Sequence, residues 1–107
     1  MKKNSFKQLA IIVPCFNEAA GLSNLLNKII SAVPGACIIV VDDGSSDDTS
    51  CVAKEYDTVL LRLPFNCGIG VAVQTGMIYA YENGFSHCIQ IDGDGQHDPR
   101  FIEVLLK

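Results

Sequence analysis

The 107-residue sequence lacks the basic patches that a nucleic-acid-binding protein uses. Its Lys/Arg clusters are no larger than the pair that follows Met1, and the formal net charge is −4. Binding to nucleic acid depends on such basic patches, because they meet the phosphate backbone. We therefore expect no nucleic-acid partner. An anionic ligand would need helix N-termini or a recruited cation to bind to this chain.

Long apolar runs and paired cysteine motifs are also missing. No stretch approaches the roughly 20 apolar residues of a membrane span, and the apolar stretch near the N-terminus is too short for a signal peptide and ends at Pro14. The five cysteines contain no Cys-x-x-Cys pair, and an odd count without zinc-type spacing favours reduced thiols. We expect a cytoplasmic protein, and a place at the inner face of the membrane stays open for a longer form of it.

The apolar residues follow two alternating patterns. Short runs rich in β-branched residues indicate buried strands, and amphipathic or capped segments between them indicate helices. The expected strands are 8–14, 36–41, 58–63 and 87–91, and the expected helices are 22–33, 45–56, 68–84 and 99–107. This alternation predicts one α/β domain, residues 1–107, with a doubly wound parallel sheet. Right-handed crossovers give the strand order 3-2-1-4.

The last expected helix ends at Lys107 without a C-terminal cap. We interpret the chain as the front part of a longer, truncated domain. In that case the fourth strand keeps an open edge and the helices lack partners, so we expect low stability or association into homo-oligomers.

Polar residues gather where each of the four expected strands ends. The clusters are "PCFNE" (14–18), "DDGSSDD" (42–48), "PFNCG" (64–68) and "DGDGQHDP" (92–99). Ligands of open parallel sheets bind at the carboxyl ends of the strands, and the opposite loops of this chain carry few such groups. The four clusters therefore predict one binding site at one edge of the sheet.

Asp92 and Asp94 are separated by a single glycine in the fourth cluster. Carboxylates at i and i+2 of an extended loop can face a common cation, and such hard oxygen ligands suit Mg²⁺ or Mn²⁺. The cation could neutralise a diphosphate that an acidic site would otherwise repel. Gly93 lets a ligand approach the backbone closely. Asp98 is followed by Pro99, and helix capping explains it well.

The second cluster begins with Asp42 and Asp43, and a carboxylate at a strand end can accept hydrogen bonds from a nucleobase or a ribose. Residues 45–48 after it suit the start of a helix. The third glycine of the dinucleotide fingerprint is absent from "GIGVAV", and the first strand continues into "PCFNEAAG" where that fingerprint should stand. These departures exclude a Rossmann domain that binds NAD or FAD.

Four segments, "IIVPCFNE", "IIVVDDGSSDDT", "NCGIGVAVQTG" and "IQIDGDGQHDP", occur in this order. Together they resemble the N-terminal, donor-binding half of the family 2 inverting glycosyltransferases of the GT-A fold, in particular the dolichyl- and polyprenyl-phosphate sugar transferases. The resemblance runs from about Ile11 to the end of the chain. It implies inverting transfer from a UDP- or GDP-linked sugar to a polyprenyl phosphate or a glycan, in cell envelope polysaccharide biosynthesis.

The resemblance also implies roles for single residues. The residues that match donor-binding positions of the first two motifs are Pro14, Phe16, Glu18, Val40 and Asp42, with Asp43 left open as the neighbour of Asp42. Asn66, Gly68 and Gly70 resemble a segment that shapes the third loop.

The fourth segment matches the D-x-D motif of the family at Asp92, Gly93 and Asp94. Here the resemblance implies that Asp94 is the principal metal ligand and Gln96 a second one, and that Asp92 contacts the nucleotide sugar and belongs to the metal site. The commonest pattern of the family has alanine in place of Gly93. The catalytic base is expected beyond Lys107.

Two alternatives remain at this point. An aspartate-nucleophile phosphatase also uses an apolar strand followed by D-x-D, but it needs this motif early in the chain and a threonine or valine where Gln96 stands. A non-enzymatic calcium-binding loop would use Asp92, Asp94, Gln96, Asp98 and Glu103 at its ligand positions, but it needs glycine where His97 stands. Tight Ca²⁺ binding without a nucleotide would distinguish the calcium-binding loop from the other readings.

Overall fold

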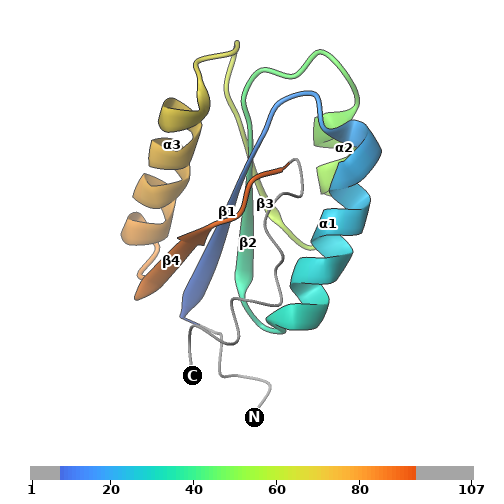
Figure 1. The fold of residues 1–107 in the computed structure, drawn as a ribbon. Helices are drawn as coiled ribbons and strands as arrows, with labels where there is room; N and C mark the ends of the chain where they lie inside the picture. Colours follow the sequence, from blue (N-terminus) through green and yellow to red (C-terminus); the bar gives the residue numbers. More distant parts are fainter. Residues whose placement is uncertain (1–7, 94–107) are drawn as a thin grey trace.

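The computed structural model describes residues 8–93 as an α/β unit of alternating strands and helices (Figure 1). In chain order its elements are β1 (Leu9–Cys15), α1 (Ala19–Ala32), β2 (Cys37–Asp42), α2 (Thr49–Lys54), β3 (Val59–Arg62), α3 (Ile69–Glu82) and β4 (His87–Gln90). The expected fourth helix, 99–107, lies outside the described residues. The other seven expected elements are confirmed, with ends shifted by a few residues.

The four strands form one parallel sheet in the order β3-β2-β1-β4. β1 lies between β2 and β4, so Ala10 is level with Cys37 on one side and with Cys88 on the other. This is the predicted order. The chain runs outward from β1 to β2 and β3, and then α3 carries it back across the sheet to β4.

The helices cover the sheet on both faces, α1 and α2 on one and α3 on the other (Figure 1). Successive side chains of a strand point to opposite faces, so Ile11 and Val13 pack beneath α1, whereas Ala10 and Ile12 pack beneath α3. All seven residues of β1 are buried. This two-sided burial is why the strand is a continuous apolar run with no polar alternation.

The helix α1 buries the face that its spacing predicted, with Leu22, Leu25, Leu26 and Ile29 against the sheet. On the opposite face α3 approaches the sheet through Gly76. A Cβ atom at Gly76 would lie 2.7 Å from Cγ2 of Ile12, so α3 sits closer to the sheet than a larger residue would allow.

The strand β4 lies at the edge of the sheet and is less buried than its apolar run suggested. Three of its four residues are exposed, and only Ile89 is half-buried. Within residues 8–93 no strand pairs with its outer side. The described helices include none that is both long and apolar enough to span a membrane.

Gly44 fixes the loop that follows β2. Its φ angle is +75°, and a Cβ atom there would lie 2.3 Å from the carbonyl carbon of Phe65 and 2.5 Å from the amide nitrogen of Asn66. Only glycine meets both conditions. The close contact holds the β3–α3 loop against the end of β2.

We expect Gly44→Ala to lower the free energy of unfolding by roughly 2–5 kcal/mol, because it combines left-handed strain with a steric clash against backbone atoms. Gly21→Ala is the matched control, since no atom lies within 4 Å of its added Cβ and the site is helical. That change should raise the stability by up to about 1 kcal/mol. Urea unfolding of both variants measures the difference, and equal effects would contradict this account of Gly44.

Candidate functional site

A cavity of about 400 Å³ opens at the carboxyl ends of the strands. The segments that follow all four strands contribute to its lining, as the four polar clusters predicted. The predicted site residues that line it are Pro14, Phe16, Glu18, Asp43, Asp92 and Gly93. Asn66 and Gly68 of the third cluster line it as well. The volume is within the range of small-molecule sites.

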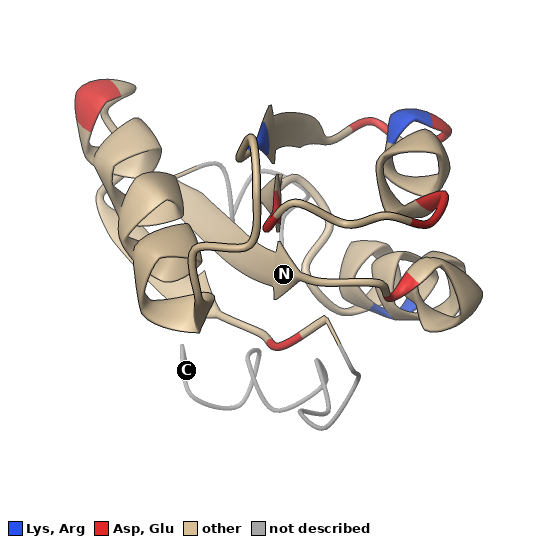
Figure 2. Ribbon diagram, turned by 90° about the horizontal axis from the view of Figure 1, so that it is seen from above, with Lys and Arg blue, Asp and Glu red and all other residues tan. Residues whose placement is uncertain are grey.

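The charged residues in this lining are all acidic, namely Glu18, Asp43 and Asp92. Figure 2 looks down onto this end of the molecule and shows acidic segments at the strand ends and in the loops beside them. No lysine or arginine belongs to the described lining. An anionic ligand would therefore meet repulsion from the described side chains unless a cation accompanied it.

The first two loops are joined by a set of hydrogen bonds around Asn17. The side-chain oxygen of Asn17 accepts hydrogen bonds from the backbone amides of Ser46 (2.9 Å) and Asp47 (3.3 Å). The backbone amide of Asn17 donates to Oγ of Ser45 (2.8 Å). Asn17 has a positive φ of 53°, a conformation that asparagine tolerates better than most residues. The amide of Glu18 then donates to Oγ1 of Thr49 (3.0 Å). These bonds fix the backbone that carries Glu18 to the cavity.

Asp47 connects the starts of two helices. Its Oδ2 accepts a hydrogen bond from the amide of Ala19, the first residue of α1 (3.2 Å), and its Oδ1 accepts from the amide of Thr49 (3.0 Å) and from the Thr49 hydroxyl. The hydroxyl of Thr49 is the main reason why the pKa of Asp47 lies below its usual value. The expected capping role of residues 45–48 therefore falls on Asp47.

Asp42 and Val40 do not reach the cavity. Asp42 is 2% exposed, its Oδ1 accepts a hydrogen bond from the amide of Ser45 (2.9 Å), and its Oδ2 accepts from the hydroxyl of Ser50. Val40 lies in the core between the sheet and α1. The structure thus uses Asp42 to hold α2 against the end of β2.

Asp43 lies in the cavity wall, although it is only 4% exposed. Its carboxylate accepts hydrogen bonds from the amide groups of Cys67 (2.7 Å) and Gly68 (3.0 Å), which immediately precede α3. A carboxylate has about four acceptor positions, so these two bonds leave capacity for a ligand. Asp43 therefore connects β2 to α3 and still presents oxygen atoms to the cavity.

The end of β4 is held tightly against the end of β1. The amide of Gly93 donates to the carbonyl oxygen of Pro14 (3.1 Å), and a Cβ atom at Gly93 would lie 2.8 Å from that oxygen and 2.8 Å from Sγ of Cys15. Next to it, Nε2 of Gln90 donates to Oδ1 of Asp92 (2.7 Å). The alanine common in the family would not fit here without a shift of the backbone.

Of the predicted metal ligands, Asp92 lies at the cavity, and Asp94 and Gln96 lie outside the described residues. Between residues 8 and 93 no three acidic, histidine or cysteine side chains are grouped closely enough to hold a metal ion. The carboxylate of Asp92 fits Mg²⁺ or Mn²⁺ in chemical type. A complete site would need ligands from residues after Gly93.

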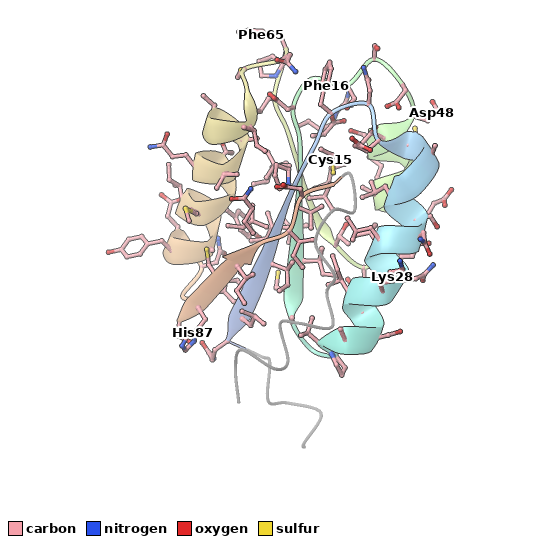
Figure 3. All side chains as sticks on the ribbon, viewed as in Figure 1. Cys15, Phe16, Lys28, Asp48, Phe65 and His87 are labelled. Carbon is pink, nitrogen blue, oxygen red and sulfur yellow. The ribbon has the colours of Figure 1, made fainter. Side chains whose placement is uncertain are left out.

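Sequence reasoning did not assign Cys15, Ile69 and Ala72, which also line the cavity. Cys15 lies near the end of β1 below Phe16, and Phe16 and Phe65 lie at the same end of the molecule (Figure 3). Cys15 is 3% exposed, and burial, with a smaller effect from Asp42 and other carboxylates, raises the pKa of its thiol to about 12. A thiol that stays protonated fills space and is a poor nucleophile.

Residues 10–107 match the model of the family described as Glycosyl transferase family 2. The chain belongs to this family. The match covers nearly the whole chain and sets aside the phosphatase and calcium-loop alternatives.

Two relatives and one solved structure illustrate the similarity. The polyprenol monophosphomannose synthase of Mycolicibacterium smegmatis is 32% identical over 102 residues, which cover 90% of this chain and 38% of the relative. The UDP-N-acetylglucosamine–dolichyl-phosphate N-acetylglucosaminyltransferase of Methanococcus voltae is 31% identical over 118 residues, covering 94% and 47%. The chain thus spans less than half the length of these relatives.

The mannosyltransferase of Pyrobaculum calidifontis, solved in complex with GDP-Man and Mn²⁺, superposes with a TM-score of 0.67 at 21% identity. The superposition covers 87% of this chain and 29% of the mannosyltransferase. It shows that the two proteins share a fold, and it confirms the GT-A architecture that the sequence resemblance implied.

Titration of Asp47 should be visible in the stability. Folding lowers the pKa of Asp47. Its carboxylate therefore stabilises the folded state at pH values above the unfolded pKa of about 3.9. That contribution is lost as the pH falls through the folded pKa. The stability difference between wild type and Asp47→Asn should be largest near neutral pH and shrink below about pH 4. Urea unfolding across this range measures it. Asp48→Asn is the control, since Asp48 makes no capping bond through its side chain, and the same pH dependence in both variants would refute the assignment.

Alkylation should separate the buried cysteine from the exposed ones. We expect iodoacetamide at mildly alkaline pH to modify Cys51 first and Cys88 more slowly, because both are exposed and burial raises the pKa of Cys88. Cys15 should stay unmodified until urea unfolds the protein. Peptide mass spectrometry over time checks this order, and labelling of Cys15 as fast as Cys51 would show that its thiol is accessible.

Proposed function

We propose that this chain forms the donor-binding half of an inverting, metal-dependent glycosyltransferase. The proposal rests on the cavity at the carboxyl edge, which the segments after all four strands line and whose charged side chains are all acidic. The donor is a nucleotide-diphosphate sugar. The name of the Methanococcus voltae relative begins with a UDP-sugar, and the Pyrobaculum calidifontis enzyme was solved in complex with GDP-Man. Both support this donor class.

In this proposal the nucleoside lies against the ends of β1 and β2. The Phe16 side chain is 44% exposed and lines the cavity, so its ring can contact the base. Asp43 accepts hydrogen bonds from the base or the ribose, whereas the Asp42 carboxylate is occupied by Ser45 and Ser50. Of the two aspartates left open by the sequence, the geometry favours Asp43.

The diphosphate lies nearer Asp92 and Gly93. Gly93 lets this segment pack closely against the end of β1, since a Cβ atom there would lie 2.8 Å from the carbonyl oxygen of Pro14. A divalent ion, Mg²⁺ or Mn²⁺, supplies the positive charge that the described lining lacks. Asp94, Asp92 and Gln96 are the proposed ligands, and the Mn²⁺ in the Pyrobaculum calidifontis complex supports the choice of metal.

The acceptor of the whole protein is a polyprenyl phosphate or a glycan. The names of the two relatives, which contain polyprenol and dolichyl phosphate, support a lipid phosphate. The base that activates the acceptor is proposed to follow Lys107. Such a reaction belongs to cell envelope polysaccharide synthesis on the cytoplasmic side, at the inner face of the membrane.

Metal and donor should bind with positive coupling. Two or three oxygen ligands hold Mg²⁺ weakly unless phosphate oxygens complete its coordination, so each partner should raise the affinity for the other by the same factor. Calorimetry of the full-length protein with UDP- and GDP-sugars, with and without Mn²⁺, measures that factor. Donor binding that is indifferent to the metal would refute the proposal.

Two conservative substitutions should separate the metal loop from helix capping. Asp94→Asn removes a charged ligand, and we expect a loss of roughly 10²–10³-fold in kcat. Asp98→Asn should have little effect, because asparagine caps a helix about as well as aspartate. Steady-state kinetics of the full-length enzyme compares them. Equal losses in the two variants would show that Asp94 has no special role.

A further inference from the structure

Asn17 lies between two residues that line the cavity, Phe16 and Glu18, and is not itself part of the lining. Its side chain instead reaches the loop that follows β2. There its Oδ1 accepts hydrogen bonds from the backbone amides of Ser46 (2.9 Å) and Asp47 (3.3 Å). A residue in this place can influence a ligand of the cavity without touching it.

Hydrogen bonds also run in the opposite direction, from the segment after β1 to the segment after β2. The backbone amides of three successive residues, Asn17, Glu18 and Ala19, donate to side chains of the second segment. The acceptors are Oγ of Ser45 (2.8 Å), Oγ1 of Thr49 (3.0 Å) and Oδ2 of Asp47 (3.2 Å). We call these three bonds, together with the two that Oδ1 of Asn17 accepts from backbone amides, the loop clamp. Each segment thus holds the backbone of the other with its side chains.

The loop clamp joins the two walls between which the nucleoside is proposed to lie. Phe16 and Glu18 line the cavity after β1, and Asp43 lines it after β2. The bonds of the clamp do not involve Asp92 or Gly93, near which the diphosphate is proposed to lie. A change in the clamp should therefore alter the nucleoside end of the cavity and spare the diphosphate end.

We propose that Asn17 is a positioning residue for the donor. Its side-chain oxygen holds the cavity wall after β1 against the wall after β2, in the arrangement that binds the nucleoside. Without Oδ1 the amides of Ser46 and Asp47 lose their acceptor, and the two walls can separate. Binding then weakens, because the groups of a site must be held close to the productive geometry. This inference rests on the proposed function, since it assigns Asn17 to the nucleoside end of the same cavity.

The position of Asn17 needs both a particular backbone conformation and an acceptor. Its φ angle is 53°, which asparagine, aspartate and glycine adopt more readily than other residues. Among the described residues, only Oδ1 of this side chain makes hydrogen bonds, and it accepts them. Aspartate can supply the same acceptor, whereas glycine supplies the conformation without it. Substitution by these two residues therefore separates the side chain from the backbone.

Calorimetry of the full-length protein with two kinds of probe, both in the presence of Mn²⁺, tests the proposal. UDP and GDP report on the nucleoside end, and inorganic diphosphate reports on the diphosphate end. We expect Asn17→Gly to weaken nucleotide binding roughly tenfold, as the loss of two hydrogen bonds would, and to leave diphosphate binding unchanged. Equal weakening of both kinds of probe would show a general loss of structure. That result, or unchanged nucleotide binding, overturns the proposal.

Two further variants show whether the acceptor oxygen is responsible. Asn17→Asp keeps the acceptor, so it should retain most of the nucleotide affinity in high salt, which screens its added charge. Asn27→Gly is the control for lowered stability, because it places glycine inside α1 and Asn27 donates to Tyr56 instead of the clamp. It should bind both kinds of probe like the wild type. Nucleotide binding by Asn17→Asp that is as weak as that of Asn17→Gly would overturn the role of the oxygen.

Hydrogen exchange separates a failure of this inference from a failure of the proposed function. The amides of Ser46 and Asp47 should exchange faster in Asn17→Gly than in the wild type, with or without a ligand. Unchanged exchange would overturn the clamp even where nucleotides bind. Faster exchange in Asn17→Gly, combined with a wild type that binds neither UDP nor GDP, would instead refute the proposed donor site and this inference with it.

Discussion

The two-sided burial of β1 is the constraint on which the other elements depend. β1 pairs with β2 and β4 and lies between α1 on one face and α3 on the other. A polar side chain within it would carry the cost of burying an unpaired group, so the polar groups of this segment lie just past the strand end, at Asn17 and Glu18. The same reasoning holds for β2, and together these strand ends bring the polar loops to one edge.

Some of the acidic residues at that edge stabilise the loops, and others line the cavity. The Asp42 carboxylate accepts hydrogen bonds from Ser45 and Ser50. The Asp47 carboxylate accepts them from Thr49 and from the first residue of α1. Asp43 holds the start of α3 and also lines the cavity. The fold therefore uses part of the acidic cluster to hold its loops together, and Glu18, Asp43 and Asp92 line the cavity.

The sequence predicted the seven described elements, their order in the sheet and the edge that carries the cavity, because apolar periodicity and crossover handedness determine these features. It could not decide between Asp42 and Asp43, since the direction of a side chain just past a strand depends on the loop hydrogen bonds that Ser45 and Cys67 provide. It also did not assign Cys15 to the cavity, because an apolar strand residue carries no sign of a neighbouring ligand site. The exposure of β4 depends on its edge position, which its own residues do not reveal.

The start of α3 belongs both to the fold and to the cavity wall. Gly68, Ile69 and Ala72 at its start line the cavity, and Asp43 holds this start in place. The charged side chains of the described lining are Glu18, Asp43 and Asp92, so an anionic ligand at this end of α3 would need a cation beside it.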